Sequence, residues 1–299
     1  MAQQDLAGKV VVITGASSGF GKGVACRFAE QGACLVLAAR RADLLAELAE
    51  HCIALGGRAI PMPADVSKRE DVERLAEAAV REYGRIDVWV NNAGVGALGR
   101  FERIPIEDHE QVIGTDLLGV LYGAYYAYPH FLKQRAGILI NISSELGGHT
   151  VPYCSSYAAA KHGVVGLGDS LRQEIAQAGM ADQIHVCTVM PAAHDTPFFD
   201  HAANYTGHEV RAPKPLHDPN DVVDTIVRLA RDPKDRDIVG GDGIVKVLMK
   251  KLAPGMQDKI AAKQVHKMQM EDAPPAADSP NALRRPMREG TEVSAGRRG

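Results

Sequence analysis

The sequence predicts an α/β fold, a doubly wound parallel sheet that forms a single domain. The first observation is a regular alternation of short apolar runs with longer amphipathic segments, from residue 9 to about residue 190. The second is that the connections between these segments are short, which leaves no room for a domain boundary. Strands that alternate with helices in this way form parallel sheets, and right-handed crossovers place the helices on both faces.

Each predicted strand is a short, mainly apolar run, and residues 10–14 form a β-branched run, the pattern of a parallel strand buried on both faces. The predicted strands are residues 10–14, 34–39, 59–63, 87–90, 137–142 and 184–189. The predicted helices between them are residues 21–31, 43–55, 69–83, 106–134 and 155–177, with Asp43 as the cap of the second. The apolar stretch 117–132 is short for a membrane span and contains Pro129 and His130, so we expect a buried helix there.

The regularity ends after Pro191. Residues 194–219 are rich in Pro, His and Asn, and irregular segments of this kind often cover active sites. A predicted helix at 221–231 and a strand at 237–239 follow. We expect a main domain over residues 6–252 and a C-terminal extension over residues 253–299, which starts with a helix at 256–270 and continues as extended or disordered chain.

The charge balance argues against a nucleic-acid partner. The 299 residues carry a net charge of −3, and 45% hydrophobic with 24% charged residues is the balance of an ordinary globular protein. From Lys246 onward 11 Lys and Arg face 6 Asp and Glu, a net charge of +5, which leaves −8 on the preceding residues. We expect this basic tail to wrap a neighbouring subunit or to contact anionic lipid or another acidic partner, with solvated disorder as the alternative.

The cysteines and histidines predict neither a metal site nor disulfides. The five cysteines are scattered without a C-x-x-C pair, and no histidines cluster at metal-ligand spacing. The first nine residues lack the cationic start and apolar run of a secretory signal peptide. We therefore expect free thiols in a reducing compartment and a cytoplasmic protein.

A glycine-rich turn with the spacing G-x-x-x-G-x-G joins the first predicted strand to the first helix. Backbone amides and the positive end of the helix dipole at such a turn can hold a pyrophosphate, and glycine allows the ligand to approach closely. The expected contact residues are Gly15, Ser17, Ser18, Gly19, Phe20 and Gly21. A purely structural tight turn is the alternative.

Two arginines follow the second predicted strand, where an acidic residue would hydrogen-bond the 2'-hydroxyl of an NAD ribose. Arg40 and Arg41 instead match a 2'-phosphate, with which guanidinium groups form paired hydrogen bonds. This favours NADP(H) as the cofactor, with NAD(H) as the alternative. Lys22, beside the glycine turn, either adds positive charge to this site or is a solvated surface residue.

Tyr157 and Lys161 lie one helical turn apart, so their side chains share a face of the predicted helix. A phenol is a weak acid at neutral pH, but an adjacent ammonium group and a positively charged nicotinamide both favour the phenolate and lower its pKa. Ser144 follows the fifth predicted strand, at the sheet edge where ligands bind, and can hydrogen-bond the same substrate oxygen. Taken singly, a packing role for the tyrosine and a surface role for the lysine are the alternatives.

Together these motifs resemble the short-chain dehydrogenase/reductase family, whose members have a Rossmann-type fold. The resemblance covers about residues 6–245 and depends on motifs in family order and spacing: Thr14-Gly15-x-x-x-Gly19-x-Gly21, Asp65-Val66, Asn91-Asn92-Ala93-Gly94, Ser144 and Tyr157-x-x-x-Lys161. It implies that Tyr157 is the acid–base residue, that Ser144 orients the substrate and that Lys161 holds the nicotinamide ribose. It also implies that Asp65, with Val66 beside it, contacts the adenine, and that residues 92–94 line the cofactor and brace the sheet.

Two positions depart from the family pattern. Asp116 stands where the family usually has an Asn that supports a water-linked proton relay to the active-site lysine. The charge of Asp116 is expected to raise the pKa values of that lysine and of the catalytic tyrosine. The usual Pro-Gly after the sixth strand is Pro191-Ala192, whereas Thr196 is kept where family members contact the nicotinamide carboxamide. We expect Asp116 to belong to the catalytic set, and Pro191 and Thr196 to the cofactor site.

The resemblance implies an oxidoreductase, a carbonyl reductase, that interconverts a small-molecule carbonyl and an alcohol by hydride transfer with NADP(H). It also implies a homodimer or homotetramer built through the helices 106–134 and 155–177. The expected substrate-pocket residues are Glu145, His149, Tyr153 and Phe198, with Phe199 and Tyr205 as further candidates and packing as their alternative role. The competing functions are an NAD-linked sugar, polyol or steroid alcohol dehydrogenase, and a non-catalytic regulator that binds NADP(H).

Overall fold

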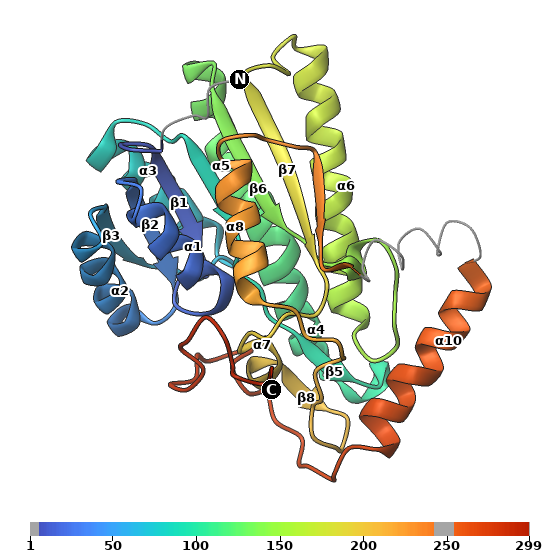
Figure 1. Ribbon diagram of the computed structural model, residues 1–299. Coiled ribbons are helices and arrows are strands. Elements are labelled where there is room, and N and C mark those ends of the chain that lie inside the picture. The colour runs from blue at the N-terminus through green and yellow to red at the C-terminus, as the bar shows by residue number, and fades with distance from the viewer. Residues whose placement is uncertain (1–5, 242–253, 299) are drawn as a thin grey trace.

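A computed structural model describes residues 6–241 and 254–298 (Figure 1). Its centre is a seven-stranded sheet with the order β3-β2-β1-β4-β6-β7-β9, parallel throughout, which confirms the predicted doubly wound class. The strands are β1 (Val10–Thr14), β2 (Cys34–Ala39), β3 (Arg58–Pro63), β4 (Val88–Asn91), β6 (Gly137–Ile142), β7 (Ile184–Pro191) and β9 (Arg236–Val239). The order reverses between β1 and β4, and folds of this kind bind ligands at such a switch point.

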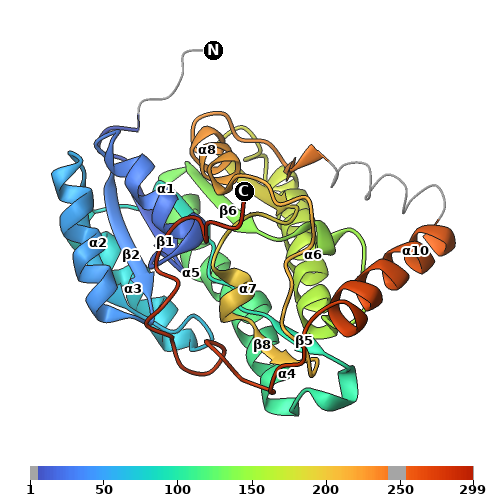
Figure 2. The same cartoon turned by 60° about the horizontal axis from the view of Figure 1, so that its bottom comes forward.

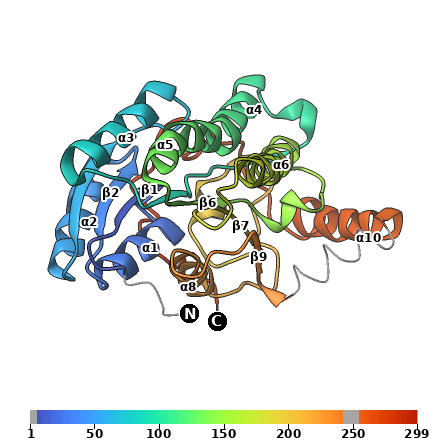
Figure 3. The same ribbon diagram turned by 90° about the horizontal axis from the view of Figure 1, so that it is seen from above.

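Helices cover both faces of the sheet, as the view from above in Figure 3 shows. One face is covered by α1 (Gly19–Ala29), α2 (Ala42–Ala54) and α8 (Pro219–Leu229). The other face is covered by α3 (Arg69–Tyr83), α5 (Gly119–Gln134) and α6 (Ser155–Gln177). The predicted helix 106–134 consists of α4 (Ile106–Ile113), a π-helical turn (Gly114–Leu118) and α5.

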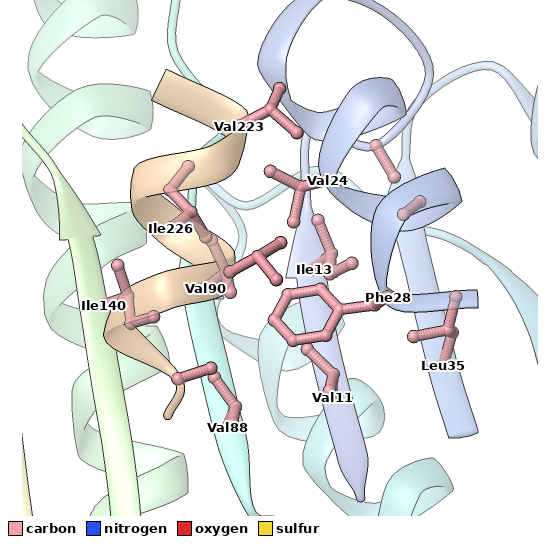
Figure 4. Close-up of a cluster of buried hydrophobic side chains, with 14 of the residues drawn as sticks. Val11, Ile13, Val24, Phe28, Leu35, Val88, Val90, Ile140, Val223 and Ile226 are labelled. Carbon is pink, nitrogen blue, oxygen red and sulfur yellow. The ribbon is translucent and has the colours of Figure 1, made fainter. Parts of the chain in front are cut away.

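The two apolar clusters follow from the alternation of side chains along each strand. In β1, Val11 and Ile13 belong to the cluster beneath α1 and α8, whereas Val10 and Val12 belong to the cluster beneath α3 and α5. Figure 4 shows the first cluster, in which the fully buried ring of Phe28 from α1 lies beside Val11 and Ile13. Burial on both faces explains why β1 is an uninterrupted apolar run.

Some boundaries differ from the prediction. α1 begins at Gly19, two residues earlier than expected, so the glycine turn itself provides the first amides of the helix. α2 begins at Ala42 with Arg41 as its cap residue, so the prediction that Asp43 caps this helix is wrong. Asp43 lies in the first turn, where a negative charge interacts favourably with the helix dipole.

A second, two-stranded parallel sheet was not predicted. It pairs β5 (Ala97–Gly99) with β8 (Ala203–Tyr205), and the short helix α7 (Phe198–His201) precedes β8. Two short 3₁₀ turns, Phe101–Arg103 and Glu145–Gly147, complete the irregular segments near this sheet edge.

The C-terminal extension packs back on its own chain. α10 (Pro254–His266) continues through a π-helical turn, Lys267–Glu271, and residues 272–298 follow without a further helix. In Figure 2 this dark red tail crosses the carboxyl edge of the sheet beside β1 and α1. The predicted boundary at residues 252–253 lies outside the described residues. Within the described ranges, no helix has the length and apolar character needed to cross a membrane.

Candidate active site

A cavity of about 820 Å³ opens at the carboxyl edge of the sheet. Its walls come from the segments that follow β1, β2, β3, β4, β6 and β7, together with the C-terminal extension. The predicted cofactor, catalytic and substrate residues line it with two exceptions, Gly21, which lies beneath the glycine turn, and the further pocket candidate Tyr205. The topology therefore brings together residues that are far apart in the sequence.

The glycine turn lies against the segment that follows β4. Gly15 has a φ of +66°, in the left-handed region that favours glycine, and a Cβ there would lie 2.7 Å from the Cα of Ala93. A Cβ on Gly21 would lie 2.2 Å from the Gly15 carbonyl oxygen. The Asn92 side-chain amide donates to the Thr14 and Gly15 carbonyls at 2.9 and 3.2 Å, which fixes the turn. Residues of the turn line the cavity, at the place where a bound pyrophosphate would meet the start of α1.

The segment after β3 forms the wall for which the resemblance implies adenine binding. Asp65 and Val66 both line the cavity, and Val66 is buried. The Asp65 carboxylate accepts hydrogen bonds from the amide and hydroxyl of Ser67 at 3.1 and 2.8 Å, an Asx turn that fixes its position. Across the sheet edge, Pro191 and Thr196 line the cavity after β7.

Arg40 and Arg41 line the cavity after β2. The Arg40 guanidinium donates to the carbonyl oxygens of residues 282 and 283 at 2.6 and 2.8 Å. Arg41 donates to the Ser17 hydroxyl at 3.0 Å and to the Met287 carbonyl at 3.1 Å. Both cations therefore lie where the sequence predicts phosphate binding, but both also hydrogen-bond the tail.

Ser144, Tyr157 and Lys161 converge on one wall of the cavity. Ser144 follows β6, and the other two residues lie one turn apart on α6. The Lys161 Nζ lies 5.4 Å from the centroid of the Tyr157 ring and donates to the Ile142 carbonyl at 3.1 Å. Ser144 is close enough to the Tyr157 phenol to lower its pKa. A hydroxyl, a phenol and an ammonium group thus share the space in which one substrate oxygen would bind.

The π-helical turn places Asp116 beside Lys161. The fully buried carboxylate lies 3.1 Å from the Lys161 Nζ and accepts a hydrogen bond from the Val95 amide at 2.8 Å. Burial raises the pKa of Asp116 above its usual range, although the charge of Lys161 acts in the opposite direction. Such π-helical turns are frequent at functional sites.

The Tyr157 phenol is a weaker acid than an exposed tyrosine. Burial raises its pKa most, and the negative charge of Asp116 raises it further, whereas the nearby Ser144 side chain lowers it. The predicted effect of Asp116 on this tyrosine agrees in direction with the structure. The phenol therefore keeps its proton at neutral pH, as a proton donor must. The lowering of the pKa expected from Lys161 and a positively charged nicotinamide together stays a prediction.

The four predicted substrate-pocket residues line the same cavity as Ser144, Tyr157 and Lys161. Glu145 and His149 are both buried, with the Glu145 Oε2 and the His149 Nε2 3.6 Å apart. The Phe198 ring centroid lies 5.4 Å from that of Tyr157. Tyr153 has a φ of +70°, and strained backbone of this kind concentrates at binding sites.

The two further pocket candidates, Phe199 and Tyr205, differ in their position relative to the cavity. Phe199 lines the cavity. Tyr205 does not, because its hydroxyl donates to the buried Asp108 carboxylate and its ring packs in the small cluster around β5. A pocket role for Tyr205 is therefore wrong, since a structural hydrogen bond holds it away from the cavity.

The C-terminal extension contributes cavity residues that the sequence analysis missed. α10 and its π-helical turn supply Ile260, Ala261, Gln264, Val265, Met268 and Gln269, and the tail supplies Ala282, Pro286 and Met287. The Tyr153 hydroxyl lies 2.6 Å from the Nδ1 of His266, which ties α10 to the loop after β6. The amphipathic pattern of 256–270 indicated a helix with an apolar face, but not the surface that this face covers.

Metal and disulfide chemistry have no visible basis in the described part of the chain. No three His, Cys, Asp or Glu side chains there are placed to hold a metal ion. All five cysteines are free thiols.

Sequence and structure comparisons agree on the family. A family model described as short chain dehydrogenase matches residues 9–205. The uncharacterized oxidoreductase YxnA of Bacillus subtilis (strain 168) is 33% identical over 92% of this chain and 77% of its own length.

Two solved structures show the same architecture. A short-chain dehydrogenase/reductase from Burkholderia phymatum in complex with NAD has a TM-score of 0.75 and 27% identity, covering 85% of this chain and 96% of that chain. An alcohol dehydrogenase from Thermococcus sibiricus complexed with 5-hydroxy-NADP has a TM-score of 0.66 and 26% identity, covering 77% and 95%. The chain belongs to the short-chain dehydrogenase/reductase family of oxidoreductases.

Proposed function

We propose that this protein is an NADP(H)-dependent oxidoreductase that interconverts a carbonyl and an alcohol, acting as a carbonyl reductase. The observation that carries the proposal is the convergence of Ser144, Tyr157 and Lys161 on the cavity that also holds the glycine turn. The similar structures that contain NAD and an NADP analogue support a nicotinamide cofactor in this cavity. The Arg40 and Arg41 side chains at the end of β2 support a cofactor with a 2'-phosphate.

The proposed cofactor site follows the walls of the cavity. The glycine turn with Ser17, Ser18 and Phe20 holds the pyrophosphate, because its residues line the cavity at the start of α1. The adenine lies against Asp65 and Val66. Residues 92–94 line the centre of the cofactor, Lys161 holds the nicotinamide ribose, and Pro191 and Thr196 contact the nicotinamide end.

The proposed chemistry divides the work between cofactor and protein. The bound nicotinamide supplies or accepts a hydride at the carbonyl carbon. Ser144 donates a hydrogen bond to the carbonyl oxygen, and Tyr157, kept neutral by burial and by Asp116, donates its proton to that oxygen. Lys161 then keeps positive charge beside the phenolate. In the oxidation direction the phenolate takes the proton of the alcohol.

The cavity supports a small substrate with an apolar body. Phe198, Phe199 and Ile260 give it apolar walls, and the Glu145 and His149 pair gives it one polar region. We propose that the apolar walls hold the body of the ketone or aldehyde and that the pair selects a hydrogen-bonding substituent.

An NAD-linked alcohol dehydrogenase is the second candidate. One observation favours it: the Arg40 guanidinium donates hydrogen bonds to the carbonyl oxygens of residues 282 and 283. In that case the arginine would hold the tail rather than a 2'-phosphate. The ratio of the Kd values for NADPH and NADH decides between the candidates.

We also propose that the protein works as a homodimer or homotetramer in the cytoplasm. The exposed apolar side chains Leu121, Tyr125 and Leu132 on α5 support association through the α4–α5 unit. The free thiols support a reducing compartment. Light scattering coupled to size-exclusion chromatography would report the mass of the assembly, and a monomer would contradict this part.

The proposed reaction is tested with a labelled cofactor. The purified protein is incubated with NADPH that carries deuterium at the transferable position of the nicotinamide and with a panel of ketones and aldehydes. The expected result is an alcohol with one deuterium on its carbinol carbon, detected by mass spectrometry. Products without deuterium, or with deuterium at another carbon, would contradict direct hydride transfer.

A further inference from the structure

The C-terminal tail hydrogen-bonds the groups that the sequence assigns to the cofactor phosphates. The Gly19 amide, at the start of α1, donates to the Glu292 carbonyl at 2.9 Å. The Lys22 Nζ lies 3.1 Å from both the Thr291 carbonyl and a Glu292 carboxylate oxygen. Arg41 donates to the Met287 carbonyl at 3.1 Å. Tail oxygens therefore occupy the glycine turn and the adjacent cations at the same time.

The tail is fixed on both sides of this crossing. Before it, Leu283 is fully buried in the small cluster around β5, and Arg284 pairs with Asp108. After it, the buried Asp195 carboxylate accepts hydrogen bonds from the Ser294 hydroxyl and the Arg297 amide, each at 2.9 Å. Residues 286–298 are here called the strap. They follow the first anchor, cross the edge of the cavity and include the second anchor, and Figure 2 shows them in dark red.

Strap and phosphate would compete for the same donors. A single backbone N–H donates one good hydrogen bond, so the Gly19 amide cannot serve both the Glu292 carbonyl and a phosphate oxygen. The Glu292 carboxylate beside Lys22 would also repel a phosphate at that position. Charge-assisted hydrogen bonds to phosphate are stronger than those to a neutral carbonyl, so the dinucleotide can displace the strap.

We propose that the strap is an internal competitor of the cofactor, closed on the phosphate donors in the free protein and displaced when the dinucleotide binds. This inference depends on the proposed function, because it takes the cavity to be a dinucleotide site. It explains why the cationic groups at the site are paired with backbone oxygens of a segment that contains no helix or strand. Only molecules with an open strap bind the cofactor. The apparent Kd therefore equals the Kd of the open form divided by the fraction of molecules in which the strap is open.

The test compares the full chain with a chain that ends at Arg285. This truncation removes the strap but keeps Leu283 in its cluster and Arg284 on Asp108. We expect the truncated chain to bind NADPH with a Kd about tenfold lower, as when nine molecules in ten hold the strap closed. The removed residues carry three Arg and two Glu, so the loss of their net positive charge alone would weaken binding of an anion.

A charge control and a second measurement make the result specific. Arg288→Ala removes one positive charge, the same net charge as the truncation, from an exposed side chain that has no hydrogen bond or ion pair within the described chain. It should not lower the Kd, because loss of positive charge alone weakens the binding of an anion. In the full chain, NADPH should increase hydrogen exchange of the amides of residues 292–298 and decrease that of residues 15–21.

The possible outcomes separate the strap from the proposed function. Equal Kd values for the two chains, or tighter binding and slower strap exchange in the full chain, would overturn the competition while leaving the cofactor site intact. Failure of both chains to bind NADPH or NADH would overturn the proposed function, and with it the competition.

Discussion

The Lys161 Nζ lies 3.1 Å from a carboxylate oxygen of Asp116, and both side chains are buried. The pair couples the π-helical turn before α5 to the catalytic face of α6. Asp116 also acts on the Tyr157 phenol, whose pKa it raises in addition to the larger effect of burial. The negative charge of Asp116 offsets the positive charge of Lys161, and by raising the pKa of Tyr157 it favours the neutral phenol.

Asp116→Asn should shift the pH dependence of alcohol oxidation to lower pH. Oxidation requires the phenolate, and removal of the carboxylate lowers the pKa of Tyr157, so the rise in rate with pH should begin earlier. Carbonyl reduction requires the neutral phenol, so in the variant its rate should fall at a lower pH than in the wild type. Glu110→Gln, a charge loss on the exposed face of α4, serves as control. Superimposable profiles for the wild type and Asp116→Asn would contradict this role.

Tyr157→Phe should abolish most turnover without loss of cofactor binding. Removal of a positioned proton donor is expected to lower kcat about 10²-fold to 10⁴-fold. The ring and its contact with Phe198 remain, so the Kd for NADPH should change little. The matched control, Tyr83→Phe, changes a half-buried phenol on α3 that does not line the cavity and should keep full activity. Steady-state kinetics and a binding titration on the same samples check both parts.

Arg41→Ala should reduce the preference for NADPH more than Arg40→Ala. The Arg41 guanidinium bonds the Ser17 hydroxyl beside the glycine turn, and its other partners belong to the displaceable strap. Both terminal nitrogens of Arg40 bond the anchored part of the tail. Loss of a charged hydrogen bond to phosphate should raise the Kd for NADPH about tenfold, with little change for NADH. Equal effects of the two variants would contradict this division of roles.

Gly21→Ala and Gly166→Ala should have opposite effects on the free energy of unfolding. A Cβ on Gly21 would lie 2.2 Å from the Gly15 carbonyl oxygen, so the glycine turn must shift, at a cost of about 1–3 kcal/mol. Gly166 lies in α6, where a Cβ would meet no neighbouring atom within 4 Å outside the backbone of its own helix, so alanine should stabilise the helix by about 0.5–1 kcal/mol. Urea unfolding of both variants measures the difference. Stabilisation by Gly21→Ala would show that the turn is not packed as described.

The sequence predicts the sheet well because period and length both identify a buried parallel strand. The apolar runs at 10–14 and 137–142 coincide with β1 and β6. β5 and β8 were missed because three residues are too few to show a period, and their pairing depends on contacts over a hundred positions apart.

In the candidate site, too, some parts could be predicted from the sequence and others could not. The glycine turn and the Ser144, Tyr157 and Lys161 set have local spacing that predicts their chemistry. The strap was not predictable, because it contacts the site mainly through backbone carbonyls, which every residue has. The basic composition after Lys246 led us to expect a tail on a neighbouring subunit or an acidic partner, or in solvent, but not on the cavity of its own chain.

The most direct measurement of the central claim follows the fluorescence of the reduced cofactor as NADPH, and separately NADH, is titrated into the protein. A mixed library of ketones and aldehydes is then added to each saturated sample. We predict tighter binding of NADPH and its oxidation on addition of the carbonyl compounds, with no oxidation before. Tight binding of NADPH without oxidation by any library member would contradict the proposed reductase and favour a non-catalytic NADP(H)-binding regulator.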